Sequence, residues 1–168
     1  MSSRTWTALA VTALIGAGLA VPAAASTSRT ANVEVLTLQK INGGRSGVGK
    51  AALVMHAGLR TKAREHSAYM IGRGGLSHDG FSTRVTSAAP DPYESNGPPD
   101  DGFRSLYSGA TYACENVAYM GGGSPTDDQI AQTFYDLWYR STSGHKECML
   151  DLHSNGYTVA GVGVGYDS

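Results

Sequence analysis

Apolar positions in the first half of the chain recur at helical spacing. Steps of three between apolar residues over residues 31–42 predict a helix that ends at the glycine pair 43–44. A second helix is predicted over residues 51–71, because one stripe of that segment is largely apolar. The stripe comprises Leu59, Ala63, His66 and Met70. Its composition predicts that His66 is a core histidine.

The second half of the chain alternates between apolar and polar positions. Residues 111–120 and 157–166 read as strands, and the proline-rich residues 87–102 between the two halves read as a loop. Ser124 followed by Pro125 predicts a helix start, and residues 145–150 predict one more helical turn. The predicted helices and strands are segregated along the chain. The pattern therefore favours an α+β fold with an antiparallel sheet.

The N-terminus carries the pattern of an export signal. Arg4 precedes an uncharged run over residues 7–21, which is shorter than the ~20 residues that a membrane-spanning helix needs. Pro22 breaks the run, and three alanines that end at Ala25 fit the cleavage pattern of a signal peptidase. We therefore expect residues 1–25 to be a signal peptide and residues 26–168 to form a single domain. This domain is expected to be secreted and to have no membrane span.

Composition and charge exclude two classes of protein. The 168 residues are 41% apolar, which is too high for a disordered chain, and the net charge of −1 argues against a nucleic-acid binder. Charge is nevertheless segregated: residues 26–84 hold 9 basic and 3 acidic side chains, whereas residues 85–168 hold 3 basic and 11 acidic ones. A basic face could meet teichoic acid, lipid head groups or nucleic acid. A solvated helix surface is the commoner origin of such a bias.

Three residues are candidates for chemistry, namely His78, Glu115 and His145. Glu115 lies on a predicted strand between apolar neighbours, where a half-buried carboxylate is costly unless it has a partner. Two imidazoles and one carboxylate form part of a ligand set for zinc or another divalent ion, and they could equally form a structural hydrogen-bonded cluster. The sequence has no Gly-x-Ser-x-Gly or His-Glu-x-x-His motif that would mark a hydrolase.

Seven short motifs, in order, resemble one known family. They are Asn42 to Arg45, Leu59-x3-Ala63-x2-His66-Ser67-x2-Met70, Leu76-Ser77-His78, Glu115-Asn116-Val117-Ala118, Phe134-x3-Trp138-x2-Ser141, Gly144-His145 and Gly161-Val162-Gly163-Val164. Over residues 33–166 the chain thereby resembles the bacterial branch of the CAP superfamily, which comprises cysteine-rich secretory proteins, antigen 5 and pathogenesis-related 1 proteins.

The resemblance implies a three-layer α-β-α sandwich with a central antiparallel sheet, and a secreted protein. It also implies a cleft in which many family members hold two histidines and two acidic residues. His78, Glu115 and His145 match three of these positions, and Ser141 stands where the second acidic residue belongs. The binding cleft is therefore expected to contain His78, Glu115, Ser141 and His145. His78 and His145 would hold a divalent metal ion such as zinc, and Glu115 would hydrogen-bond behind them.

A disulfide between Cys114 and Cys148 follows from the resemblance together with the predicted export. The two cysteines are the only ones in the chain, and each lies beside a motif that the resemblance places in the cleft. An oxidising compartment favours such a bond. In a rival interpretation, Cys148 is a metal thiolate beside His145.

The resemblance leaves the function open among three classes. The first is a non-enzymatic binding domain for a small apolar molecule, a lipid or other cell-envelope component, or a divalent ion. The second is a metal-assisted extracellular hydrolase in which His78 and His145 hold the ion and Glu115 is the general base. The third is a structural envelope protein whose cleft has lost its role. We expect the binding domain.

Overall fold

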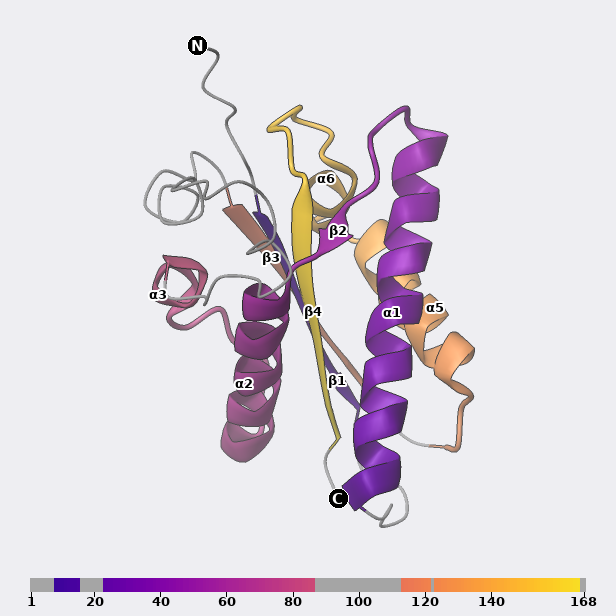
Figure 1. Cartoon of the computed structure of the whole chain (residues 1–168), viewed down its shortest axis with the longest axis vertical. Helices are drawn as coiled ribbons and strands as arrows, with labels where there is room; N and C mark the ends of the chain where they lie inside the picture. The colour runs from indigo at the N-terminus through magenta and orange to yellow at the C-terminus, as the bar shows by residue number, and fades with distance from the viewer. Residues whose placement is uncertain (1–7, 16–22, 87–112, 122, 167–168) are drawn as a thin grey trace, which may run out of the picture.

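A four-stranded sheet lies in the middle of the molecule, with helices on both of its faces (Figure 1). The computed structural model describes residues 8–15, 23–86, 113–121 and 123–166, so the predicted loop at 87–102 lies outside the described residues. In chain order the elements are β1 (Ala8–Ile15), α1 (Ala23–Gly47), β2 (Val54–Met55), α2 (Ala57–Arg73), α3 (Phe81–Thr86), β3 (Ala113–Met120), α5 (Asp127–Tyr139), α6 (His145–Leu150) and β4 (Val159–Tyr166).

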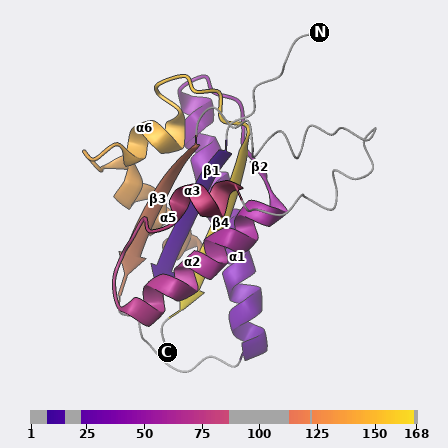
Figure 2. The ribbon, with the colours of Figure 1, turned by 90° about the vertical axis from the view of Figure 1, so that its left-hand side faces the viewer.

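The helices form two layers of unequal size. α2 and α3 cover one face of the sheet, where α2 crosses β1 and β4, and α1, α5 and α6 cover the other face (Figures 1 and 2). The main hydrophobic core lies between the sheet and the second layer, around the fully buried Phe134 and Trp138 of α5. A smaller cluster around Leu59 and Val85 lies under α2 and α3.

The sheet is parallel, so the predicted antiparallel sheet and α+β class are wrong. The strand order is β2-β4-β1-β3, and each neighbouring pair runs in the same direction. Parallel neighbours need a crossover connection, and helices lie between successive strands along this chain. The sequence pattern does not reveal this alternation, because residues 8–15 resemble part of a signal peptide and residues 54–55 lie in a predicted helix.

β1 occupies a central position although its sequence reads as part of an export signal. Its eight residues are paired with β3 on one side and β4 on the other. Val11, for example, lies opposite Asn116 of β3 and opposite Val162 of β4. Cleavage after Ala25 concerns the processing of the chain and stays a prediction.

α1 continues beyond the glycine pair at which the sequence predicts its end. Gly44 packs so closely against α5 and α6 that a Cβ there would lie 2.4 Å from the hydroxyl oxygen of Tyr135. The next residue, Arg45, is buried and donates to the backbone carbonyls of Ala51, Met149 and Tyr157. These tertiary contacts outweigh the low helix propensity of glycine.

Two other helix starts differ from the prediction. Residues 54–55 form β2, and α2 begins only after His56, whose Nδ1 accepts a hydrogen bond from the backbone N–H of Leu59. α5 begins after Thr126 rather than Ser124. Thr126 and Gln129 form a capping box, in which each side chain satisfies the other residue's backbone N–H. The predicted helical turn at residues 145–150 is confirmed as α6.

A buried carboxylate joins α1, α2 and β4. Glu34 of α1 is fully buried and accepts hydrogen bonds of 2.6 to 2.7 Å from Arg60 and Arg64 of α2. Glu34 also accepts a hydrogen bond from the backbone N–H of Val164 in β4. The short strand β2 pairs with β4 only at Val159 and Ala160 and does not reach Val164. The charge of Glu34 is thereby paired, as a buried charge must be. Glu34 positions α2 over the sheet.

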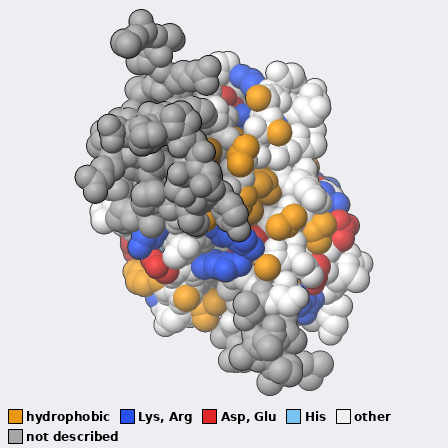
Figure 3. Space-filling model, viewed as in Figure 1, with side chains coloured by type: hydrophobic (Ala, Val, Ile, Leu, Met, Phe, Trp, Pro, Cys, Tyr) orange, Lys and Arg blue, Asp and Glu red, His pale blue; other side chains and the backbone are white. Residues whose placement is uncertain are grey.

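Basic side chains of the first half of the chain form ion pairs with acidic side chains of the second half. Arg29 and Lys40 of α1 pair with Asp127 and Asp128 at the start of α5. On the face that Figure 3 shows, basic and acidic side chains lie near one another. This distribution agrees with a solvated, ion-paired surface and gives no support to a separate basic face.

Candidate functional site

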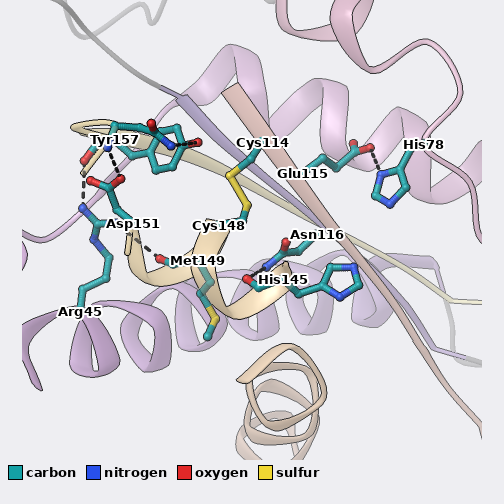
Figure 4. The surroundings of a disulfide bond; sticks show 11 residues. Arg45, His78, Cys114, Glu115, Asn116, His145, Cys148, Met149, Asp151 and Tyr157 are labelled. Atoms are coloured by element: carbon teal, nitrogen blue, oxygen red, sulfur yellow. Dashed lines mark hydrogen bonds and ion pairs between the residues drawn. A yellow bond between two sulfur atoms is a disulfide. The ribbon is translucent and has the colours of Figure 1, made fainter. Parts of the chain in front are cut away.

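A disulfide fastens the edge strand β3 to α6 (Figure 4). Cys114 and Cys148 are joined by an S–S bond of 2.06 Å, with their Cα atoms 6.0 Å apart. The predicted pairing is confirmed, and the thiolate interpretation of Cys148 is wrong because its sulfur is already bonded. The disulfide holds together the two elements that carry Glu115 and His145.

Glu115 lies at the centre of an ion-paired group. Its side chain is 2% exposed and follows Cys114 on β3. One carboxylate oxygen lies 2.9 Å from Nδ1 of His78, and the other accepts a hydrogen bond of 2.5 Å from Arg84 of α3. The costly buried carboxylate that the sequence predicts therefore has two partners. His78 itself is 53% exposed, so its ring can meet a ligand from solvent.

His145 and Ser141 form a second pair, close to the start of α6. A hydrogen bond of 2.7 Å joins Ser141 Oγ and His145 Nδ1, and the same oxygen accepts the backbone N–H of Ser143. The fully buried Asn116 of β3 donates its side-chain amide to the backbone carbonyl of His145 at 2.9 Å. The start of α6 is therefore fixed to β3 by this amide in addition to the disulfide.

The two histidines lie within electrostatic range of each other. Burial lowers the pKa of His145, and the charge of His78 lowers it further, while Glu147 acts in the opposite direction. Neutral imidazole is therefore the dominant form of His145 at pH 7. In both rings Nδ1 has a polar partner, and Nε2 is the nitrogen that points elsewhere. In the view of Figure 4 the rings of His78 and His145 lie on opposite sides of the β3 ribbon.

A groove of about 810 Å³ lies between β3, α5 and the segment that leads into α6. Its lining residues are Leu76, Val117, Ala118, Tyr119, Thr133, Asp136, Leu137, Trp138, Arg140, Ser141, Thr142, Ser143 and His145. Of the four residues predicted to share one cleft, Ser141 and His145 line the groove, whereas His78 and Glu115 do not. Leu76 also lines the groove and precedes His78 by two residues, so the segment that carries His78 passes beside the groove.

The sequence pattern does not reveal the roles of Arg84 and Asn116. Arg84 lies 31 residues before Glu115, on a short helix that the pattern did not predict, so no sequence signal linked them. Asn116 belongs to a motif of the family resemblance, but its contact with the His145 backbone depends on how α6 meets β3. Both residues position site groups, and neither lines the groove.

The donor set for a metal ion is small. Among the described residues, no group of three or more histidine, cysteine, aspartate or glutamate side chains is arranged to hold a metal. Both oxygens of Glu115 already have partners. Two imidazole nitrogens fit a divalent ion, and other ligands would have to complete its shell.

Comparison with protein-family models, curated proteins and solved structures finds no match for this chain. The resemblance to the CAP superfamily therefore stays a prediction. None of the described helices is long and apolar enough to cross a membrane.

Proposed function

We propose that this chain is an exported, CAP-like binding domain whose groove beside β3 takes a small apolar molecule. The observation that carries the proposal is the gathering of exposed apolar side chains around one hollow. Leu76, Tyr119 and Leu137 are 47%, 53% and 46% exposed, and all three line the groove. Single exposed apolar residues are ordinary, but several around a concave surface are typical of a binding site.

The size and polarity of the groove support the same ligand class. A volume of about 810 Å³ lies within the ~300–1,000 Å³ of small-molecule sites. The wall formed by β3 and α5 is largely apolar apart from Thr133 and Asp136, and Ser141 and His145, which hydrogen-bond to each other, make the α6 end polar. A ligand with an apolar body and one polar or anionic end fits this arrangement, and a lipid from the cell envelope has that chemistry.

The alternative of a metal-assisted hydrolase has less support. Its general base would be Glu115, whose two oxygens pair with His78 and Arg84. A general base needs a free oxygen within hydrogen-bond reach of the water that it activates. Glu115 would therefore have to leave one partner before it could act.

Binding of an apolar probe tests the proposed groove. The fluorescent probe 1-anilinonaphthalene-8-sulfonate is titrated into the wild type, Leu137→Asp and Leu152→Asp. Leu137→Asp should weaken binding about tenfold or more, because it removes an apolar contact and adds a carboxylate beside the anionic probe. Leu152→Asp is the matched control, since Leu152 is similarly exposed at 41% but lies outside the groove. Equal affinities of the three proteins would contradict the proposal.

A divalent-metal site at His78 and His145 is a second candidate. The observation that favours it is that Glu115 and Ser141 hold the two Nδ1 atoms, because metal-binding histidines commonly have their second ring nitrogen fixed by a polar partner. His78 and His145 would then bind through Nε2, and water would supply other ligands. A bound divalent ion would supply a positive charge beside the groove.

Calorimetric titration with zinc tests this site. The wild type should show a saturable heat at pH 7 that the double variant His78→Ala/His145→Ala loses, because both nitrogen donors are gone. His153→Ala controls for removal of an exposed histidine elsewhere. If the double variant gives the same heat as the wild type, zinc binds at another place and this candidate fails.

A further inference from the structure

A serine and a histidine form a hydrogen-bonded pair at the polar end of the groove. Oγ of Ser141 and Nδ1 of His145 are 2.7 Å apart. This separation lies within the roughly 2.6–3.2 Å over which a histidine base takes the proton of a serine hydroxyl. Both residues line the groove, so a molecule bound there can reach the hydroxyl oxygen.

The hydroxyl of Ser141 is oriented by the backbone of the same segment. The N–H of Ser143 donates to Oγ at 3.1 Å, which leaves the hydroxyl hydrogen available for Nδ1 of His145. In that arrangement the ring of His145 carries its own proton on Nε2. A metal ion on Nε2 requires the other tautomer, in which Nδ1–H donates to Ser141. The reactive pair and the metal site are therefore alternative states of His145.

The position of His145 is fixed through its backbone. The side-chain amide of the buried Asn116 donates to the carbonyl of His145 at 2.9 Å (Figure 4). Cys148, three residues further along α6, is bonded to Cys114 of the same strand as Asn116. A reactive pair needs such support, because its geometry has to persist when substrate binds. Among the described residues, none hydrogen-bonds to Nε2 of His145.

A carboxylate with an unused oxygen lies near the same ring. Oε2 of Glu147 is buried and has no hydrogen-bond partner among the described residues. Burial, followed by the charge of His78, lowers the pKa of His145, whereas the charge of Glu147 raises it. Glu147 therefore favours the imidazolium form of His145, which is the form that exists once the ring has taken the serine proton.

We propose that Ser141 and His145 are the nucleophile and the general base of an esterase site, whose substrates are oxygen esters with an apolar acyl chain. The acyl chain lies along the part of the groove that Tyr119 and Leu137 line, and the ester carbonyl lies at Ser141. This inference goes beyond the proposed function, because it adds a reaction. It rests on that function for the binding of the acyl chain.

The reaction forms and breaks an ester on the serine. Oγ of Ser141 attacks the carbonyl carbon while its proton passes to Nδ1 of His145. The bond from that carbon to the alcohol oxygen then breaks, and His145 returns the proton to the leaving alcohol. Water attacks the acyl-serine with His145 again as the base, which releases the carboxylic acid and restores the serine. Arg140, which lines the groove 3.9 Å from Asp136, can offset the negative charge of the tetrahedral intermediate.

Reaction with p-nitrophenyl octanoate tests the proposal in the full chain with its disulfide intact. The wild type should release nitrophenolate in a fast first turnover and should carry an octanoyl group on Ser141, located by mass spectrometry of peptides. Ser141→Ala should lose this adduct, and His145→Gln should acylate about a hundredfold or more slowly. Ser46→Ala and His153→Ala are the matched controls and should react like the wild type, because both side chains are exposed outside the groove.

Two further rates test the roles of the charge and of the acyl chain. Glu147→Gln should slow acylation by about tenfold without changing the ester concentration at half-saturation, because the charge acts on the imidazolium rather than on the bound ester. The acetyl ester should react about tenfold or more slowly than the octanoyl ester with the wild type, because it has no chain for the groove. Equal rates for the two esters would overturn the proposed substrate class.

The absence of an adduct on Ser141, or equal acylation of the wild type and a folded Ser141→Ala, would overturn the esterase site. If Ser141→Ala does not fold, a long-chain alkyl fluorophosphonate keeps the test decisive, because an activated serine in the wild type displaces its fluoride and becomes labelled. An unlabelled Ser141 would overturn the proposal. Displacement of the apolar fluorescent probe by the octanoyl ester separates the two claims. Displacement without acylation refutes the esterase site alone, whereas an ester that neither displaces the probe nor acylates Ser141 contradicts the proposed groove as well.

Discussion

Gly163→Ala is expected to destabilise the protein by about 3 kcal/mol or more. A Cβ at this position would lie 2.2 Å from the carbonyl carbon of Ala63 and 2.2 Å from the backbone nitrogen of Arg64. These atoms belong to the backbone of α2, which cannot move aside as a flexible side chain can. The methyl group would therefore push α2 away from β4 and would strain the ion pairs between α2 and Glu34.

Chemical denaturation of Gly163→Ala and Gly72→Ala measures this effect against a matched control. Gly72 lies in α2, is exposed, and has no atom within 4 Å of the position of a Cβ. Alanine there should stabilise the protein by about 0.5–1 kcal/mol, because glycine is a poor helix former. If both variants unfold at the wild-type denaturant concentration, α2 does not approach β4 as closely as the structure indicates.

The glycines of β4 illustrate what the sequence can and cannot predict. Residues 157–166 are recognisable as a strand because valines recur among them. The reason for Gly161 and Gly163 appears only in the structure, where they lie under Leu59 and Ala63 of α2. Local pattern predicts that an element exists, whereas the distance between two elements depends on the packing of both.

The sheet shows the same limit at a larger scale. Local patterns indicated β3 and β4 but could not order or orient them, since strand pairing is a contact between residues far apart in sequence. The error in direction arose at residues 8–15, where an apolar run fits both a leader and a buried strand. Without that strand, the alternation of strands and helices that indicates a parallel sheet was lost.

The candidate site was predictable in its residues and less so in its arrangement. The structure joins His78 to Glu115 and Ser141 to His145, so that each of the two disulfide-linked elements, β3 and α6, carries one member of a pair. It adds Arg84, which neutralises Glu115 and reduces its suitability as a base. Burial and ion pairing of a carboxylate are tertiary properties, so a motif that names Glu115 does not reveal whether its oxygens are free.

Loss of the Cys114–Cys148 disulfide is expected to have the second large effect, of about 4 kcal/mol. The bond closes a loop with a sequence separation of 34 residues, and a loop of that length restricts the unfolded chain considerably. In the folded state the disulfide also fastens α6 to β3. Its loss leaves the Asn116 amide as the side-chain hydrogen bond between β3 and the backbone of His145. The groove wall at the α6 end should therefore loosen as stability falls.

Thermal unfolding of the wild type with and without a dithiol reductant, beside Cys114→Ser/Cys148→Ser, measures this contribution. The reductant should lower the melting temperature of the wild type by roughly 10 °C and leave that of the double variant unchanged. Serine keeps the approximate size of cysteine, so the variant should unfold close to the temperature of the reduced wild type. The same samples titrated with the apolar probe should show weaker binding whenever the disulfide is absent, because the end of the groove at His145 is no longer held to β3. A wild type whose melting temperature does not respond to the reductant, although thiol labelling shows that both cysteines are reduced, would contradict the stabilising role of the bond.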